Sequence, residues 1–241
     1  MSILLGEIRN QKGEKLDYTL HRADQETKHI VVIGHGVTGN KDRPLIVALA
    51  EELAESGIHA LRFSFSGNGN SEGEFKDSCI SKEVEDLGCV LDALSGFQIS
   101  YAGHSMGGAV GVLRASRDTR IKKLISLAGM VHTKDFAQRE FGSETPDQGC
   151  MWENPECPLS STYMEDMANI GTVIPQASKV QIPWLLIHGT EDDVVPVEDS
   201  TDILTRSSQA AELFKIEGAD HVFDGTATRA MTQKVVEWLK A

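Results

Sequence analysis

The sequence lacks several features that would point to whole classes of protein. Its 241 residues contain no apolar run near the roughly 20 residues that a membrane-spanning helix needs. It carries 23 Lys and Arg against 36 Asp and Glu, a formal net charge of −13, which argues against nucleic acid or an anionic membrane as the main partner. The four cysteines form no C-x-x-C pair, and no set of His, Cys, Asp and Glu has metal-ligand spacing. We therefore expect neither a metal ion nor another cofactor.

The start of the chain also lacks the basic residues and long apolar stretch of a signal peptide. Together with cysteines that suggest no disulfide framework, this predicts a cytoplasmic protein with reduced thiols. No internal repeat or low-complexity linker divides the chain, so we expect a single domain over residues 1–241. We expect that domain to be a monomer or a homodimer.

The sequence does contain apolar, strand-like runs that alternate with amphipathic, helix-like segments. This alternation predicts an α/β protein with a doubly wound, mostly parallel sheet. The expected strands are 29–33, 59–65, 97–101, 123–128, 184–188 and 211–217, and the expected helices are 42–56, 81–94, 107–116 and 228–240. Residues 2–9 and 15–22 flank a turn-rich break, which predicts an N-terminal β-hairpin.

One segment, residues 131–181, breaks this alternation. It places about 50 residues between two expected strands, where a single crossover helix needs far fewer. The segment is rich in aromatic residues and methionines, including Phe136, Trp152 and Met167. We expect an insertion that lies over the sheet edge as a lid; a surface excursion without function and a protein-binding patch are the alternatives.

The stretch Gly103-His104-Ser105-Met106-Gly107 lies between an expected strand and an expected helix. A strand that turns abruptly into a helix holds its middle residue in a strained conformation, and small residues are needed two positions to either side. The serine hydroxyl is then held out at the carboxyl edge of the sheet, beside a helix N-terminus that stabilises negative charge. Ser105 is therefore the candidate nucleophile.

A serine nucleophile needs a base to take its proton and a carboxylate to orient the base. His221 follows the last expected strand, on a loop at the same sheet edge as Ser105. Residues 191–193, Glu-Asp-Asp, follow the expected strand 184–188, and by location all three acids qualify. We expect His35, His104 and His188, which lie in or at the end of strands, to have structural roles instead.

In its order of serine, acid and histidine, the sequence resembles the α/β-hydrolase fold family. The resemblance covers nearly the whole chain apart from residues 131–181. That family marks its triad acid with Gly-x-x-Asp-x-x-Val-Pro and its base with Gly-x-x-His. The matching residues here are Gly189, Asp192, Val195 and Pro196 for the acid, and Gly218 and His221 for the base. The resemblance thus implies a catalytic triad of Ser105, Asp192 and His221.

Further motifs are similar to particular branches of the family. Residues 62–73 are similar to a loop of serine esterases and acylglycerol lipases, and residues 35–41 resemble the cinnamoyl and feruloyl esterase branch, with Val37 where that branch usually has a bulky aromatic residue. The family's oxyanion loop then implies that the backbone N–H groups of Val37 and Met106 form the oxyanion hole. We expect the substrate to contact Gly36, Trp152, Val194 and Val222.

These observations predict a serine hydrolase that cleaves small-molecule carboxylic esters of small to medium acyl chain through an acyl-enzyme. A thioesterase, an amidase and a small-molecule sensor on the same scaffold are the alternatives. Residues 34–39 also read as G-x-G-x-x-G, a pattern of dinucleotide-binding folds. Such a site needs an acid at the end of the next strand, and residues 63–66, Phe-Ser-Phe-Ser, supply none.

Overall fold

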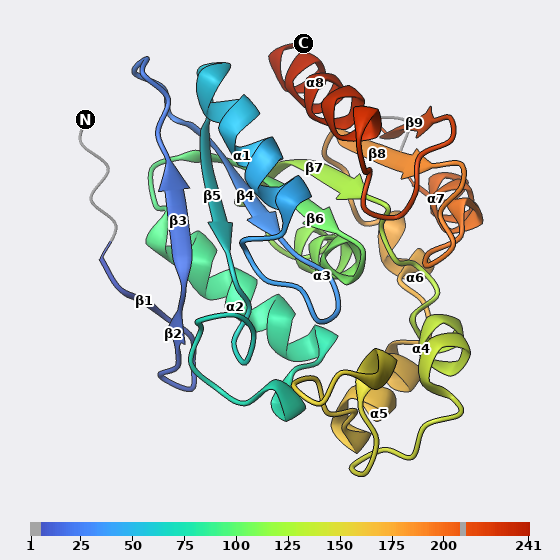
Figure 1. Cartoon of the computed structure of the whole chain (residues 1–241). Coiled ribbons are helices and arrows are strands. Elements are labelled where there is room, and N and C mark those ends of the chain that lie inside the picture. The colour runs from blue at the N-terminus through green and yellow to red at the C-terminus, as the bar shows by residue number, and fades with distance from the viewer. Residues whose placement is uncertain (1–5, 208–210) are drawn as a thin grey trace.

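The computed structural model describes residues 6–207 and 211–241, and its centre is a seven-stranded sheet (Figure 1). Each pair of neighbouring strands is parallel except β3 with β5, so the predicted mostly parallel sheet is confirmed. In sheet order the strands are β3 (Tyr18–His21), β5 (His59–Phe63), β4 (His29–Gly34), β6 (Gln98–His104), β7 (Ile121–Leu127), β8 (Trp184–Gly189) and β9 (Ala211–Ile216).

Helices cover both faces of this sheet, and the strand sequences explain why. In β4, Ile30 and Val32 point into one hydrophobic core while Val31 and Ile33 point into the other. A strand that is apolar on both faces must be covered on both. Helices α1 (Pro44–Glu55) and α8 (Thr226–Lys240) cover one face, and α2 (Ile80–Ala93) and α3 (Met106–Ala115) cover the other (Figure 1).

The N-terminal hairpin is shorter than the sequence predicts. It consists of β1 (Ile8–Arg9) paired with β2 (Lys15–Leu16), and the predicted residues 2–5 lie outside the described part of the chain. The expected second strand, 15–22, changes partner at Asp17, whose N–H donates to Ser71 Oγ and whose carbonyl accepts from Ser64 N. After that residue the chain becomes β3, the antiparallel edge strand of the large sheet.

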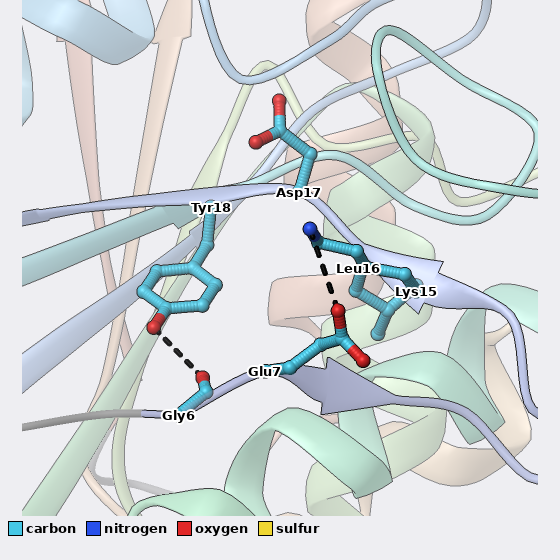
Figure 2. Close-up of a pocket in the computed structure, with 6 residues that line it drawn as sticks. All are labelled: Gly6, Glu7, Lys15, Leu16, Asp17 and Tyr18. Atoms are coloured by element: carbon cyan, nitrogen blue, oxygen red, sulfur yellow. Dashed lines mark hydrogen bonds and ion pairs between the residues drawn. The ribbon is translucent and has the colours of Figure 1, made fainter.

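A hollow of about 380 Å³ lies where this hairpin meets β3 (Figure 2). The Tyr18 hydroxyl donates to the Gly6 carbonyl at 2.9 Å, and Lys15 pairs with Glu7 at 3.5 Å. The lining residues are Gly6, Glu7, Lys15, Leu16, Asp17 and Tyr18, none of which the sequence marks as a site residue.

Helix α7 (Val197–Leu204), which was not among the expected helices, lies between β8 and β9. Pro196 occupies its N-cap position, and Glu198 and Asp199 lie in its first turn, where acidic residues favour a helix. The Pro at the N-cap, the two acids and the partly apolar pattern that ends at Ile203 are the features of the sequence that indicate this helix.

Residues 131–181 fold into α4 (Thr133–Phe141), the short turn η2 (Met151–Glu153), α5 (Ser161–Ile170) and α6 (Ile174–Ala177). Helices α4 and α5 lie beyond the end of the sheet to which the arrows of β4 and β5 point (Figure 1). Their packing buries Phe136, Phe141 and Tyr163, so most of the aromatic residues of this segment form an extension of the core.

A further short turn, η1 (Phe75–Asp77), precedes α2. In the described part of the chain, no helix has both the length and the apolar character needed to cross a membrane.

Candidate active site

Ser105 lies at the sharp turn from β6 into α3, with φ 54° and ψ −120°. A positive φ is strained for any residue with a side chain and persists only where surrounding contacts fix it. Here the Ser105 N–H donates to the Leu127 carbonyl at 2.9 Å, while the Ser105 carbonyl accepts from Gly108 N at 2.9 Å and Met130 N at 3.0 Å. The backbone on both sides therefore holds the serine in this conformation.

Three glycines allow the elements around Ser105 to approach one another closely. A Cβ added at Gly103 would lie 2.1 Å from the Gly107 carbonyl oxygen, and one at Gly107 would lie 2.6 Å from the His35 carbonyl oxygen. A Cβ at Gly36 would lie 2.7 Å from the Cβ of Ser105 itself. The loop after β4 therefore rests directly against the serine, and a side chain at any of these positions would push it away.

His221 and Asp192 meet at the same edge of the sheet, on the loops that follow β9 and β8. His221 Nδ1 lies 2.8 Å from Asp192 Oδ2, and the Asp192 side chain is inaccessible to solvent. The two other acids that the sequence left open, Glu191 and Asp193, are exposed. Of the three, Asp192 is the acid that contacts His221.

Asp192 accepts hydrogen bonds at both carboxylate oxygens. Its Oδ1 accepts from Val194 N at 2.9 Å and from Val195 N at 2.8 Å, and its Oδ2 lies 3.2 Å from His188 Nε2. Burial raises the pKa of Asp192, but hydrogen bonds from His188 and His221, with the charge of His221 and the Val195 amide, hold that pKa below its usual value. The carboxylate is therefore ionised at neutral pH and fixed in orientation.

His188 contributes to this arrangement although the sequence suggested only a packing role. Its Nδ1 lies 2.7 Å from Ser200 Oγ, and its Nε2 lies 2.9 Å from the Val195 carbonyl. Because a carbonyl only accepts, the proton lies on Nε2, which shares it between Val195 and Asp192. The only sequence signal for this role is that His188 ends β8 four residues before the acid.

His35 and His104 are buried and neutral, and each holds one of the loops around Ser105. Burial lowers the pKa of His104 to about 3, and its Nε2 lies 2.9 Å from the His221 carbonyl, to which it donates. Burial lowers the pKa of His35 to about 4; its Nε2 accepts from Phe65 N at 3.1 Å, so its Nδ1 donates to the Gly36 carbonyl at 2.9 Å. Both expected structural roles thus serve the site.

A cavity of about 320 Å³ opens beside Ser105 and brings most of the predicted site residues together. Asp192 lies behind His221 and Met106 is buried at the start of α3, so neither lines the cavity. No site residue was predicted in the remaining wall, which the rest of the loop after β4 and the first turn of α1 supply. The lining residues are His35, Gly36, Val37, Thr38, Gly39, Arg43, Leu45, Ile46, His104, Ser105, Trp152, Val194, His221 and Val222.

Two backbone amides beside Ser105 are available to a ligand. Within residues 6–207 and 211–241, neither the Val37 N–H nor the Met106 N–H donates a hydrogen bond. The Met106 amide begins α3, and the loop that carries Val37 is brought against the serine by Gly36. In the same described ranges, no group of three His, Cys, Asp or Glu side chains is placed to hold a metal ion.

Comparison with known proteins agrees with this architecture. Residues 25–143 match the family model described as serine aminopeptidase S33. The structure of Est1E from Butyrivibrio proteoclasticus with bound ferulic acid superposes with a TM-score of 0.87 over 97% of this chain and 98% of that chain, at 27% identity. The chain has the α/β-hydrolase fold.

Two other similarities place this α/β hydrolase among varied relatives. It is 27% identical over 175 residues to the human mitochondrial palmitoyl-protein thioesterase ABHD10, a match that covers 65% of this chain and 55% of that protein. The matched part of the chain thus spans little more than half the length of the human protein. The monoacylglycerol lipase of Paleococcus ferrophilus shares the fold, with a TM-score of 0.75, 19% identity and coverage of 93% and 98%.

Proposed function

We propose that this α/β hydrolase is a serine esterase that cleaves carboxylic esters of small to medium acyl chain. One observation carries the proposal: Ser105, held at a strained turn, faces the same cavity as His221, and His221 is hydrogen-bonded through Nδ1 to the buried, ionised Asp192. A nucleophile, a base and a group that orients the base are the parts that acyl transfer to serine needs.

In the proposed reaction, Ser105 Oγ attacks the acyl carbon of the ester while His221 Nε2 takes the hydroxyl proton. The tetrahedral intermediate collapses, the bond to the alcohol oxygen breaks, and His221 gives the proton to the leaving alcohol. Water then attacks the acyl-enzyme with His221 again as base, and the carboxylic acid leaves as the Ser105 hydroxyl re-forms. Asp192 holds the imidazole in the tautomer that leaves Nε2 free to accept.

The developing negative charge on the carbonyl oxygen needs donors, and we assign that role to the backbone N–H groups of Val37 and Met106. Both amides are unused within the described ranges, and Gly36 holds the loop before Val37 against Ser105. Donors fixed by the fold stabilise such an oxyanion without having to reorganise.

The cavity supports small or medium substrates. Its volume of about 320 Å³ is near the lower end of the range of roughly 300–1,000 Å³ that is typical for small-molecule sites. Leu45, Ile46, Val194 and Val222 supply apolar lining suited to an acyl chain. We also propose that residues 131–181 act as a lid of this single domain, because Trp152 lines the cavity and is 45% exposed.

Hydrolysis of p-nitrophenyl esters from acetyl to palmitoyl tests the proposal. The wild type should show an optimum in the short to medium range, and Ser105→Ala should lower kcat/KM by about 10³-fold or more while leaving the melting temperature intact. Ser116→Ala, at the far end of α3, is the matched control and should keep full activity. Retention of more than a tenth of the activity in Ser105→Ala would refute the assignment.

A thioesterase is the second candidate, favoured by the similarity to palmitoyl-protein thioesterases. The same serine chemistry cleaves a thioester, so the decision lies in relative rates. Comparing octanoyl thiocholine with p-nitrophenyl octanoate would separate the two; a much higher kcat/KM for the thioester would favour the thioesterase.

The human relative is named as a mitochondrial protein, whereas a cytoplasmic location is what we propose for this chain. Imaging of the tagged protein would test that location.

A further inference from the structure

The charge on the wall of the proposed active-site cavity differs from the charge of the whole protein. The chain has 36 acidic and 23 basic side chains, yet no carboxylate is among the described residues that line this cavity. Apart from its three histidines, the lining residues that the structure describes contain a single ionisable group, the guanidinium of Arg43. The wall of the cavity in this acidic protein therefore carries a positive charge, and that charge could interact with a ligand.

Arg43 is held at the cavity rim with most of its hydrogen-bonding capacity unused. It is the N-cap residue of α1, its N–H donates to the Asn40 carbonyl at 3.3 Å, and its exposed side chain donates through Nη2 to the Thr38 carbonyl at 3.1 Å. A guanidinium has five N–H donors, so others stay available. Within residues 6–207 and 211–241, Arg43 forms no ion pair with a carboxylate.

The acid nearest in sequence is engaged elsewhere. Asp42 accepts from Lys41 Nζ at 2.9 Å and pairs with Arg62, on the side of the β3–β5 edge. These two cations hold the pKa of the Asp42 carboxyl below its usual value against a smaller effect of burial, with the Lys41 hydrogen bond as the largest cause. Asp42 is thus neutralised by two other groups, which leaves the charge of Arg43 without a local counterion.

The charge of Arg43 acts on His35, which lines the cavity, and on Cys157 of the insertion. Burial is the main cause that lowers the pKa of His35 on the sheet side and raises the pKa of Cys157 on the insertion side. The nearby positive charge of Arg43 contributes a lowering to both pKa values. Arg43 also lines the same cavity as Val37 of the loop after β4 and Trp152 of the insertion.

We propose that Arg43 selects ester substrates that carry an anionic group, with a carboxylate as the test case, on the acyl or the alcohol side of the scissile bond. Guanidinium binds carboxylate through paired, charge-assisted hydrogen bonds, so a fixed and unpaired arginine in a cavity without acids matches such a group. This inference rests on the proposed ester hydrolysis, and it adds the substrate's charge to that function.

Two pairs of esters test the selection on each side of the bond. Mono-p-nitrophenyl glutarate against p-nitrophenyl valerate places the carboxylate on the acyl side, and 4-carboxyphenyl butyrate against phenyl butyrate places it on the alcohol side. For one pair, the ratio of kcat/KM for the anionic ester to that for the neutral ester should fall about tenfold in Arg43→Met, since one charge-assisted contact is worth roughly that factor. The neutral esters should change less than twofold.

Control variants separate recognition from a structural role of Arg43. Arg43→Lys keeps the charge and should keep part of the preference. Arg117→Met removes the same charge beyond the far end of α3, where Arg117 pairs with Glu85, and should leave both ratios unchanged. Unchanged ratios in Arg43→Met for both pairs would overturn the proposal, as would an equal fall for anionic and neutral esters.

Binding distinguishes failure of this inference from failure of the proposed function. Calorimetry with 4-carboxyphenyl butyrate and with mono-p-nitrophenyl glutarate on Ser105→Ala and on Ser105→Ala/Arg43→Met needs no turnover. The double variant should bind one of these two esters about tenfold more weakly. If the wild type hydrolyses no ester, the proposed function fails while these ratios of Kd values still decide the role of Arg43; equal Kd values for both esters would reject that role.

Discussion

The two walls of the cavity are built in different ways. On the sheet wall, His35, His104 and Ser105 are at least 92% buried, and backbone contacts or hydrogen bonds to backbone groups fix each of them. On the insertion wall, Trp152 is 45% exposed and has a positive φ of 46°. Its ring packs against the ring of Phe141, with 4.9 Å between the ring centroids, and its Nε1 donates to Glu140 Oε2 at 3.1 Å.

This difference suggests that the two walls have different roles in the proposed enzyme. Glycines at positions 36, 103 and 107 bring backbone against backbone on the sheet wall, so little there can change without moving Ser105. The insertion wall is held by side chains that can be replaced one at a time. We infer that the sheet wall determines the reaction and that the insertion wall adjusts the preference for acyl length.

The largest expected effect tests the sheet wall directly. Asp192→Asn keeps the shape of the acid but loses its charge and favours the wrong tautomer of His221, so kcat/KM should fall by about 10³–10⁴-fold. Asp193→Asn, the same change at the exposed neighbouring residue, should stay within about threefold. Steady-state kinetics on the best p-nitrophenyl ester measures both, and equal losses would leave the acid unassigned.

A second prediction concerns the buried histidines of the sheet wall. Burial lowers the pKa of His35 to about 4 and that of His104 to about 3, below the value of about 6.5 in the unfolded chain. The unfolded state therefore binds more protons, and the free energy of unfolding is fully present above pH 6.5 and falls as the pH drops toward 4. The loss at pH 5 should be on the order of 2 kcal/mol per histidine.

Urea unfolding between pH 7.5 and 5 measures this dependence. His104→Gln removes one of the two groups and should flatten the slope of unfolding free energy against pH, whatever it does to stability at pH 7.5. A slope identical to that of the wild type would contradict the assignment of His104 as neutral in the folded state.

The smallest expected effect tests the insertion wall. Trp152→Ala removes an exposed ring that lines the cavity, so the melting temperature should change by only a few degrees. KM for the longer acyl esters should change several-fold, whereas kcat for acetyl esters should stay within about twofold. A loss of kcat as large as that of Asp192→Asn would break the division between the two walls.

Much of this could be predicted from the sequence because its signals are local. Ile30 to Ile33 form a continuous apolar run, and such a run must be buried on both faces of a sheet. Ser105 stands between glycines at a strand-to-helix turn, and its strained φ of 54° follows from that local pattern. Helix α7 and the change of partner at Asp17 were missed because their signals are weak or depend on contacts far along the chain.

The sequence by itself determined the alternation of strands and helices, the position of the candidate nucleophile and the loops that carry the candidate acid and base. The family motif selected Asp192 among the three acids, and the tertiary structure brings it against His221. Only the tertiary structure decided that His188 and His104 support that pair, and that Arg43 lines the cavity. The physical reason is the separation along the chain over which each kind of interaction acts. Periodicity and turn chemistry act between neighbours in the chain, whereas hydrogen bonds such as that between Asp192 and His221 depend on how separate loops meet at one sheet edge.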